Sequence, residues 1–249
     1  MTIMSVEGLL IPNTPLHGQM NLAALFSGGK DSTYAIYQAQ KLGHAVKCLI
    51  TILPHSADSH LLHHPNISKT NLQAKSMNIP QILIESGSDD TKHELQLLKE
   101  GLAEAKRDYS IDGVVHGGIL SEFQKSGFES VAKDLGLDVI APIWKKDQRQ
   151  YMSDLIDSGF EFIIISVSCD GLDDSWLGKK ITKQNLDSLI EKSQKHKFNL
   201  SFEGGEAETF VVNCPLFSGA IEITDSHKHW DGYRGRFEIL HAKIKDNAR

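Results

Sequence analysis

The segment NLAALFSGGKDS, residues 21–32, joins an apolar run to a polar hexapeptide that contains two glycines. NLAALF is typical of a buried strand, and the following STYAIYQAQKLG has the spacing of an amphipathic helix. A glycine-rich turn between the first strand of a parallel sheet and its helix lies at the carboxyl edge of that sheet, where doubly wound folds bind ligands. The position of SGGKDS alone therefore predicts a binding site.

Strand and helix patterns alternate through the first half of the chain. Predicted strands lie at residues 21–26, 45–52, 81–85, 112–118 with its loop, and 138–143. Predicted helices lie between them at residues 32–43, 67–78, 91–109 and 121–136, two of which end at the C′ glycines Gly43 and Gly136. This alternation predicts an α/β fold with a five-stranded parallel, doubly wound sheet and right-handed crossovers.

The regular alternation ends after Pro142. The remainder reads as a helix at 147–159, an apolar strand at 160–168, a helix at 182–197, and then short strands joined by turns. We therefore expect a flexible N-terminal extension at residues 1–19, a nucleotide-binding domain at 20–143, and a smaller α+β domain at 144–249.

Composition excludes several classes of function. The net charge of −6 provides no global basic field for long nucleic acid. Three scattered cysteines form neither a disulfide framework nor a metal knuckle, which favours a cytoplasmic protein. No apolar run is long enough to span a membrane, and residues 1–19 lack the features of a signal peptide.

The hexapeptide has the composition of a phosphate cradle. Gly28 and Gly29 allow backbone amides and the helix N-terminus to approach an anion. Lys30 adds a positive charge, and Ser27 and Ser32 add hydroxyl donors. The spacing is that of neither a Walker A loop nor a dinucleotide-binding fingerprint.

SGGKDS resembles the PP-loop of ATP pyrophosphatases, which release AMP and pyrophosphate from ATP. The resemblance implies an adenine nucleotide alpha hydrolase-like fold and ATP as the nucleotide. It also implies that Asp31 contacts a Mg²⁺ ion shared with the phosphates, because hard cations prefer oxygen ligands.

Most of the chain from Met20 resembles the diphthine-ammonia ligase family. The stretches that carry this resemblance are HPNISKTNLQAKSMNIP at 64–80, VHGGILSEFQ at 115–124, GLDDSWLGK at 171–179, and FEGGEAETFVVNCPLF at 202–217. Such enzymes adenylate the carboxylate of diphthine on translation elongation factor two and let ammonia displace AMP, which gives diphthamide. The resemblance therefore implies ATP, ammonium and this elongation factor as partners, and it leaves a homodimer open.

The second glycine loop follows the fourth predicted strand. Gly117 and Gly118 should face SGGKDS across the point where the strand order reverses, and Ser121 begins the next helix. We assign these three residues, with the six of SGGKDS, to nucleotide binding. Gln124 is assigned to the acceptor substrate on the resemblance.

Three carboxylates, Glu203, Glu206 and Glu208, lie within six residues beside two glycines. Such a cluster repels itself unless a cation is near, and magnesium, ammonium or the trimethylammonium group of diphthine would serve. The predicted catalytic residues are Lys30, Glu206 and Glu208. Glu203, Glu206 and Thr209 are predicted to bind the acceptor.

Two positions depart from the family pattern. The chain has Ala207 where relatives often have an aromatic residue, and Gly127 where they often have an arginine. Two alternatives therefore stay open, a PP-loop amidase that acts on another carboxylate or an RNA base, and a nucleotide-binding sensor without catalysis. The sensor would have no need for the three carboxylates of residues 203–208, which we call the acidic signature.

Overall fold

The computed structural model describes residues 18–55, 66–88, 90–119 and 122–245, and only the backbone of residues 122–125. Ser121 and the predicted extension as far as residue 17 lie outside this description, as does the side chain of Gln124.

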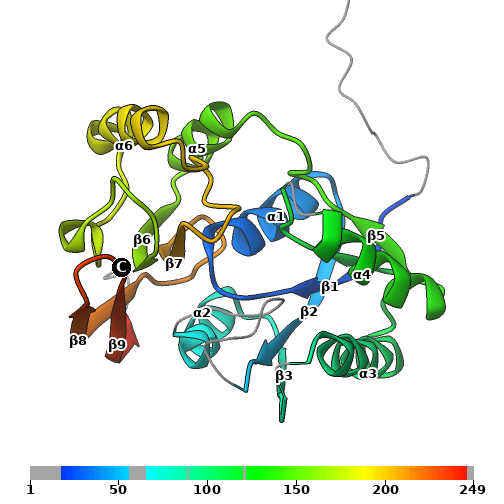
Figure 1. Ribbon diagram of the computed structural model, residues 1–249. Helices are drawn as coiled ribbons and strands as arrows, with labels where there is room; N and C mark the ends of the chain where they lie inside the picture. Colours follow the sequence, from blue (N-terminus) through cyan, green and yellow to red (C-terminus); the bar gives the residue numbers. More distant parts are fainter. Residues whose placement is uncertain (1–17, 56–65, 89, 120–121, 246–249) are drawn as a thin grey trace, which may run out of the picture.

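The first sheet has five parallel strands in the order β3-β2-β1-β4-β5 (Figure 1). These strands are β1 (Asn21–Leu25), β2 (Ala45–Leu53), β3 (Gln81–Glu85), β4 (Gly113–Val115) and β5 (Asp138–Ile140). The strand order reverses between β1 and β4, which places SGGKDS beside the switch point where such folds bind ligands. The predicted fold class is confirmed.

Helices cover both faces of this sheet. They are α1 (Lys30–Lys41), α2 (Thr70–Met77) after the short 3₁₀ helix η1 (Ile67–Lys69), α3 (Thr91–Tyr109) and α4 (Glu122–Asp134). In β1, Leu22 and Ala24 pack with the core under α1 and α2, whereas Ala23 packs with the core under α3 and α4. This alternation follows from the two-residue period of a strand. Gly43 and Gly136 end their helices with φ of 91° and 61°, as predicted.

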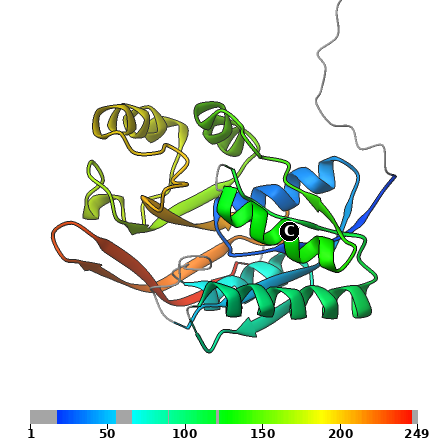
Figure 2. The same ribbon diagram turned by 45° about the vertical axis from the view of Figure 1, so that its right-hand side comes forward.

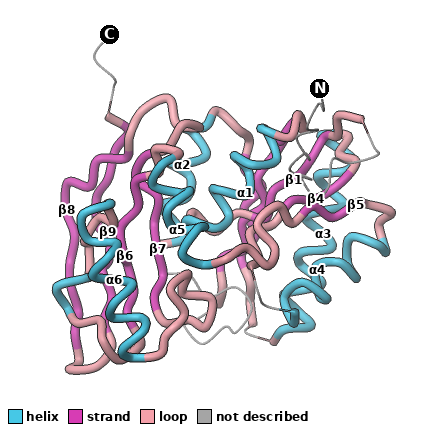
Figure 3. Tube along the Cα trace, turned by 90° about the horizontal axis from the view of Figure 1, so that it is seen from above, coloured by secondary structure: helices cyan, strands magenta, loops and turns pink. Residues whose placement is uncertain are grey.

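The second sheet has four strands in the order β7-β6-β9-β8, with antiparallel pairing throughout. Its elements are α5 (Gln148–Asp157), β6 (Glu161–Val167), the 3₁₀ helix η2 (Asp174–Trp176), α6 (Lys183–His196), β7 (Ala207–Asn213), β8 (Ile221–Trp230) and β9 (Gly235–Ile244). Seen from above, the two sheets lie on either side of α1 and α2 (Figure 3).

The last two strands are longer than the sequence pattern indicated. β8 and β9 have 10 residues each and form a ribbon that reaches away from the body of the molecule (Figure 2). Most of β8 is exposed, so its sequence lacks the apolar alternation that marks a half-buried strand. The expectation of short strands was therefore wrong for this hairpin.

One hydrophobic cluster contains residues from both halves of the chain. Tyr34 of α1 and Ile119 belong to the same buried cluster as Tyr151 of α5 and Phe162 of β6. Within the described ranges, no helix combines the length and apolar character needed to cross a membrane.

The side chain of Asn66 links the two halves of the chain by pairing with the backbone of β9, as a neighbouring strand would. Its Nδ2 donates to the carbonyl of Phe237, 2.8 Å away, and its Oδ1 accepts from the amide of Ile239 at 2.7 Å. Its φ of 62° lies in the left-handed region, which asparagine tolerates better than most residues. The start of α2 is thereby fixed to β9.

We expect Asn66→Ala to lower the free energy of unfolding by about 2 kcal/mol, because two hydrogen bonds to buried backbone are lost. Urea unfolding measures the change. Asn71→Ala, which truncates an exposed asparagine on α2, is the matched control and should have little effect. Equal stability of the two variants would contradict a stabilising role for the contact between Asn66 and β9.

Candidate functional site

The loop between β1 and α1 is held closed by its two serines. The Oγ atoms of Ser27 and Ser32 lie 3.2 Å apart, and the Ser32 Oγ also accepts from the Ser27 amide at 3.3 Å. Gly29 is the N-cap residue of α1 and has no side chain that could cap the helix. The N-terminus of α1, with its positive dipole end, therefore opens onto the loop.

The carbonyl of Gly28 is bound from both sides. It accepts from the amide of Val211 on β7 at 3.0 Å and from Nε2 of Gln73 on α2 at 2.9 Å. The same Nε2 donates to the Val211 carbonyl at 2.7 Å. A β-carbon on Gly28 would lie 2.3 Å from Gln73 Oε1, and φ is +80° there, so only glycine fits.

Lys30 is 2% exposed and is bound by the second half of the chain. Its backbone amide donates to Thr209 Oγ1 at 3.1 Å, and its Nζ donates to the carbonyl of Ser201 at 2.6 Å. The same Nζ donates to Asp31 at 2.9 Å and lies 5.3 Å from the centroid of the Phe202 ring. A buried charge needs such partners, and most of them come from residues 201–209.

Phe202 occupies an unusual backbone conformation. Its φ is 64°, a region that bulky residues rarely adopt, and its ring stacks on Phe198 with 6.3 Å between centroids. The conformation places the ring under the Lys30 ammonium. Strain of this kind is held only where surrounding contacts compensate for it, and it is common at functional sites.

The Asp31 carboxylate also contacts α5. Its Oδ1 accepts a 2.6 Å hydrogen bond from the Tyr151 hydroxyl, while Oδ2 accepts from Lys30. The Asp31 side chain is 29% exposed, whereas Tyr151 is fully buried. Burial, and then the charge of Asp31, raise the pKa of Tyr151 well above its ordinary value, so the phenol stays a donor.

The second glycine loop packs directly on the first. A β-carbon on Gly117 would lie 2.4 Å from the carbonyl carbon of Asp31 and 2.5 Å from the Ser32 amide nitrogen. The amide of Gly118 donates to Nδ1 of the buried His116 at 3.1 Å. The two loops are therefore neighbours across β1 and β4, and their roles in nucleotide binding stay predictions.

Glu206 organises its own loop. Its Oε1 accepts from the backbone amide and the side-chain amide of Asn199, at 2.9 and 3.0 Å, and its Oε2 accepts from Gly204 at 2.8 Å. A carboxylate that receives three hydrogen bonds is well suited to hold this turn in shape. Whether it also contacts an acceptor remains a prediction.

Glu208 lies on β7, in a partly buried position, beside the residues that surround Lys30. Burial raises the pKa of its carboxyl to about 8, against the lowering effect of Lys30. The negative charges of Asp31, Glu203 and Glu206 raise it further. The acidic signature and the SGGKDS loop thus form one electrostatic cluster.

Four contributors to this site were not predicted from the sequence. They are Gln73, Tyr151, Ser201 and Phe202. Gln73 and Phe202 lie within the stretches 64–80 and 202–217 that carry the family resemblance, whereas no motif marks Tyr151 or Ser201. The structure also shows what surrounds Ala207 and Gly127, the two positions that depart from the family pattern. Ala207 is 3% exposed at the start of β7, and a β-carbon on Gly127 would lie 3.2 Å from Leu95.

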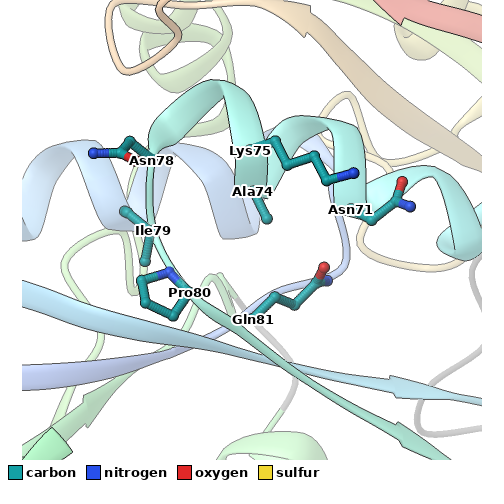
Figure 4. A pocket seen from close by; sticks show the side chains of 7 residues that line it. All are labelled: Asn71, Ala74, Lys75, Asn78, Ile79, Pro80 and Gln81. Carbon is teal, nitrogen blue, oxygen red and sulfur yellow. The ribbon is translucent and has the colours of Figure 1, made fainter.

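A separate pocket of about 410 Å³ lies between α2 and β3 (Figure 4). Its lining residues are Asn71, Ala74, Lys75, Asn78, Ile79, Pro80 and Gln81. It contains none of the predicted site residues. Among the residues that the structure describes, no three His, Cys, Asp or Glu side chains are grouped to hold a metal ion.

Comparison with known proteins gives two family matches. Residues 20–139 match the diphthamide synthase N-terminal domain, and residues 147–244 match the diphthamide synthase C-terminal domain. Diphthine–ammonia ligase from Danio rerio is 33% identical over 92% of this chain and 99% of its own length. The Homo sapiens enzyme of the same name is 33% identical, with coverages of 83% and 84%.

A solved structure from Methanocaldococcus jannaschii, described as the predicted subunit of a tRNA methyltransferase, is 18% identical. The match covers 78% of this chain and 97% of that one, with a TM-score of 0.39. This likeness is too weak to inform either fold or function.

The raised pKa of Glu208 makes stability depend on pH. The carboxyl titrates near its ordinary 4.5 when unfolded and at about 8 when folded, so the folded protein binds the extra proton between these values. The stabilisation is complete below pH 4.5 and is lost as pH rises through about 8.

Glu208→Gln removes this titration, and its melting temperature should exceed that of the wild type at high pH by about 3 °C or more. The two proteins should converge towards pH 5. Scanning calorimetry across this range measures the difference, with Glu238→Gln on the exposed hairpin as control. A constant difference at every pH would contradict the raised pKa.

Proposed function

This chain belongs to the diphthamide synthase family, and we propose that it amidates diphthine on translation elongation factor two with ammonia, at the expense of ATP. The products are diphthamide, AMP and pyrophosphate. It is thus an AMP-forming carbon–nitrogen ligase.

One observation carries the proposal from family to mechanism. The residues on either side of the acidic signature at 203–208 contact SGGKDS directly: Ser201 and Thr209 bind Lys30, and Val211 binds Gly28. A sensor that only bound ATP would have no use for carboxylates around its phosphate loop, because they repel phosphate. An enzyme that also has to place a cationic acceptor and ammonia beside the nucleotide does use them.

The nucleotide-binding residues that we propose are those predicted from the sequence. The N-terminus of α1, the glycine amides and the Lys30 ammonium favour a polyphosphate. Ser27 and Ser32 line the same turn. The phosphates would then lie against the N-terminus of α1, next to the residues of β7.

Mg²⁺ fits this arrangement as an ion held mainly by the phosphates. Such an ion needs few protein ligands, and the Asp31 carboxylate is exposed enough to supply one of them. Each oxygen of Asp31 already accepts one hydrogen bond and keeps a second lone pair. Bound there, the ion would neutralise phosphate charge.

The reaction consists of two substitutions. An oxygen of the diphthine carboxylate attacks the α phosphorus and pyrophosphate leaves, which gives an acyl-adenylate. Ammonia then attacks the acyl carbon, AMP leaves, and the nitrogen loses a proton. Glu208 is the base that we propose for this proton, because a carboxylate with a pKa of about 8 matches the working pH better than an ordinary one.

The other carboxylates have supporting roles in this scheme. Glu203 is the residue that we propose to face the trimethylammonium group of diphthine. Glu206 would act mainly by holding the turn in shape, because Asn199 and Gly204 already bind its carboxylate. We further propose that residues 20–143 bind the nucleotide, that residues 144–249 bind the acceptor, and that the protein works in the cytoplasm.

The reaction type is tested by incubating the protein with ATP, magnesium, ammonium and diphthine-bearing elongation factor. We expect AMP and pyrophosphate in equal amounts, with one amide formed per AMP. ADP and phosphate would contradict the PP-loop chemistry. Intact ATP with every acceptor would favour the sensor, and AMP release with a different carboxylate or an RNA base would redirect the proposal to another acceptor.

Lys30→Ala should lower turnover by ~10²-fold, comparable to the loss of one electrostatic donor at a transition state. Steady-state kinetics with saturating acceptor measure it. Lys41→Ala, an exposed lysine in the last turn of the same helix, is the matched control and should keep normal rates. Equal rates for both variants would place the phosphate site elsewhere.

A further inference from the structure

Tyr151 reaches the nucleotide loop from a part of the chain 120 residues away. Its hydroxyl donates to Asp31 Oδ1 at 2.6 Å, and this is the short distance expected for a hydroxyl on an ionised carboxylate. The tyrosine is fully buried on α5. Its bond to Asp31 is therefore shielded from solvent on the tyrosine side.

The direction of the Tyr151 hydroxyl is fixed by packing. The ring lies edge-on to Tyr34, with 5.7 Å between centroids, and Tyr34 packs in turn on Phe160 at 5.2 Å. A functional group is held most accurately when its own side chain is locked by neighbours. The aromatic cluster provides this lock at the place where α1 meets α5.

The same face of α5 also binds residues 199–201, which precede the acidic signature. Gln148, three residues before Tyr151, accepts from the Ser201 amide at 3.2 Å and donates to Asn199 Oδ1 at 3.1 Å. Residues three apart on a helix are neighbours. One turn of α5 thus contacts both Asp31 and the loop whose carbonyl binds the Lys30 ammonium.

We propose that Tyr151 is a positioning residue for the nucleotide, which fixes the Asp31 carboxylate and, through Asp31, the ammonium of Lys30. This inference rests on the proposed ATP-dependent function. Without the Tyr151 hydroxyl, the Asp31 carboxylate keeps its hydrogen bond from Lys30, and this partly exposed carboxylate is free to rotate. Residues that orient a phosphate or metal contact commonly alter affinity when they are removed.

Tyr151→Phe tests the proposal, because it removes the hydroxyl and keeps the ring. Calorimetric titration with ATP in excess magnesium, without acceptor, gives the dissociation constant. We expect it to rise by about 10-fold, within the range typical of losing a residue that orients a ligand-binding group. The KM for ATP should rise similarly, while kcat at saturating ATP changes less.

Tyr34→Phe is the matched control. It removes the hydroxyl of a second buried tyrosine in the same aromatic cluster, and that hydroxyl interacts with Ser158 and Gln38 rather than with the loop. We expect its ATP affinity to equal that of the wild type. Equal losses in both variants would show a general packing effect and overturn the positioning role.

A double-mutant cycle with Asp31→Ala separates positioning from stability. If Tyr151 acts through Asp31, Tyr151→Phe has no further effect on ATP affinity once Asp31 is truncated. A full additional 10-fold loss would overturn the proposal. ATP binding requires no acceptor, so these outcomes remain readable even if the protein does not amidate diphthine, whereas product analysis alone tests the reaction.

Discussion

The contact on which the site depends is the one between the SGGKDS loop and strand β7. The carbonyl of Gly28 accepts from Val211, and the amide of Lys30 donates to Thr209, so the loop is bonded to the second sheet at two residues that are two positions apart. Buried backbone groups require partners, and here a neighbouring sheet supplies them. We therefore infer that the SGGKDS loop depends on both sheets for its observed shape.

Electrostatics reinforce this junction. The buried Lys30 ammonium brings positive charge among Asp31 and the carboxylates of the acidic signature, and the carbonyl of Ser201 binds it. Glu208 is affected in the opposite way by this environment, since burial and neighbouring negative charges favour its neutral form. Binding of a polyphosphate, a cationic acceptor or ammonium at this place would change the charge around both residues. The two proposed steps, adenylation and amidation, would therefore be coupled, because Lys30 and Glu208 belong to the same charged cluster.

Much of this architecture could be predicted from sequence. Residues 91–109 form a helix with the predicted limits, because the amphipathic spacing is regular and Asp90 caps it through the amide of His93. The first sheet followed from alternating apolar runs. The β8–β9 ribbon did not, because exposed strands carry little hydrophobic pattern. Tyr151 and Gln73 occupy ordinary positions in amphipathic helices, so their contacts with the loop depend on tertiary packing that local spacing does not encode. For Glu206, composition indicated a charged site but could not show that its carboxylate holds its own turn.

The inferred dependence of the SGGKDS loop on the second sheet is tested most directly by amide hydrogen exchange in Thr209→Val. This variant keeps the shape of the side chain and removes the oxygen that accepts from the Lys30 amide at 3.1 Å. Loss of a hydrogen bond of about 1 kcal/mol should speed exchange at Lys30 and the adjoining loop roughly fivefold. Amides in the middle of α3, on the far face of the first sheet, should exchange as in the wild type. Unchanged exchange at Lys30 would contradict the account, because the loop would then hold its shape without the second sheet.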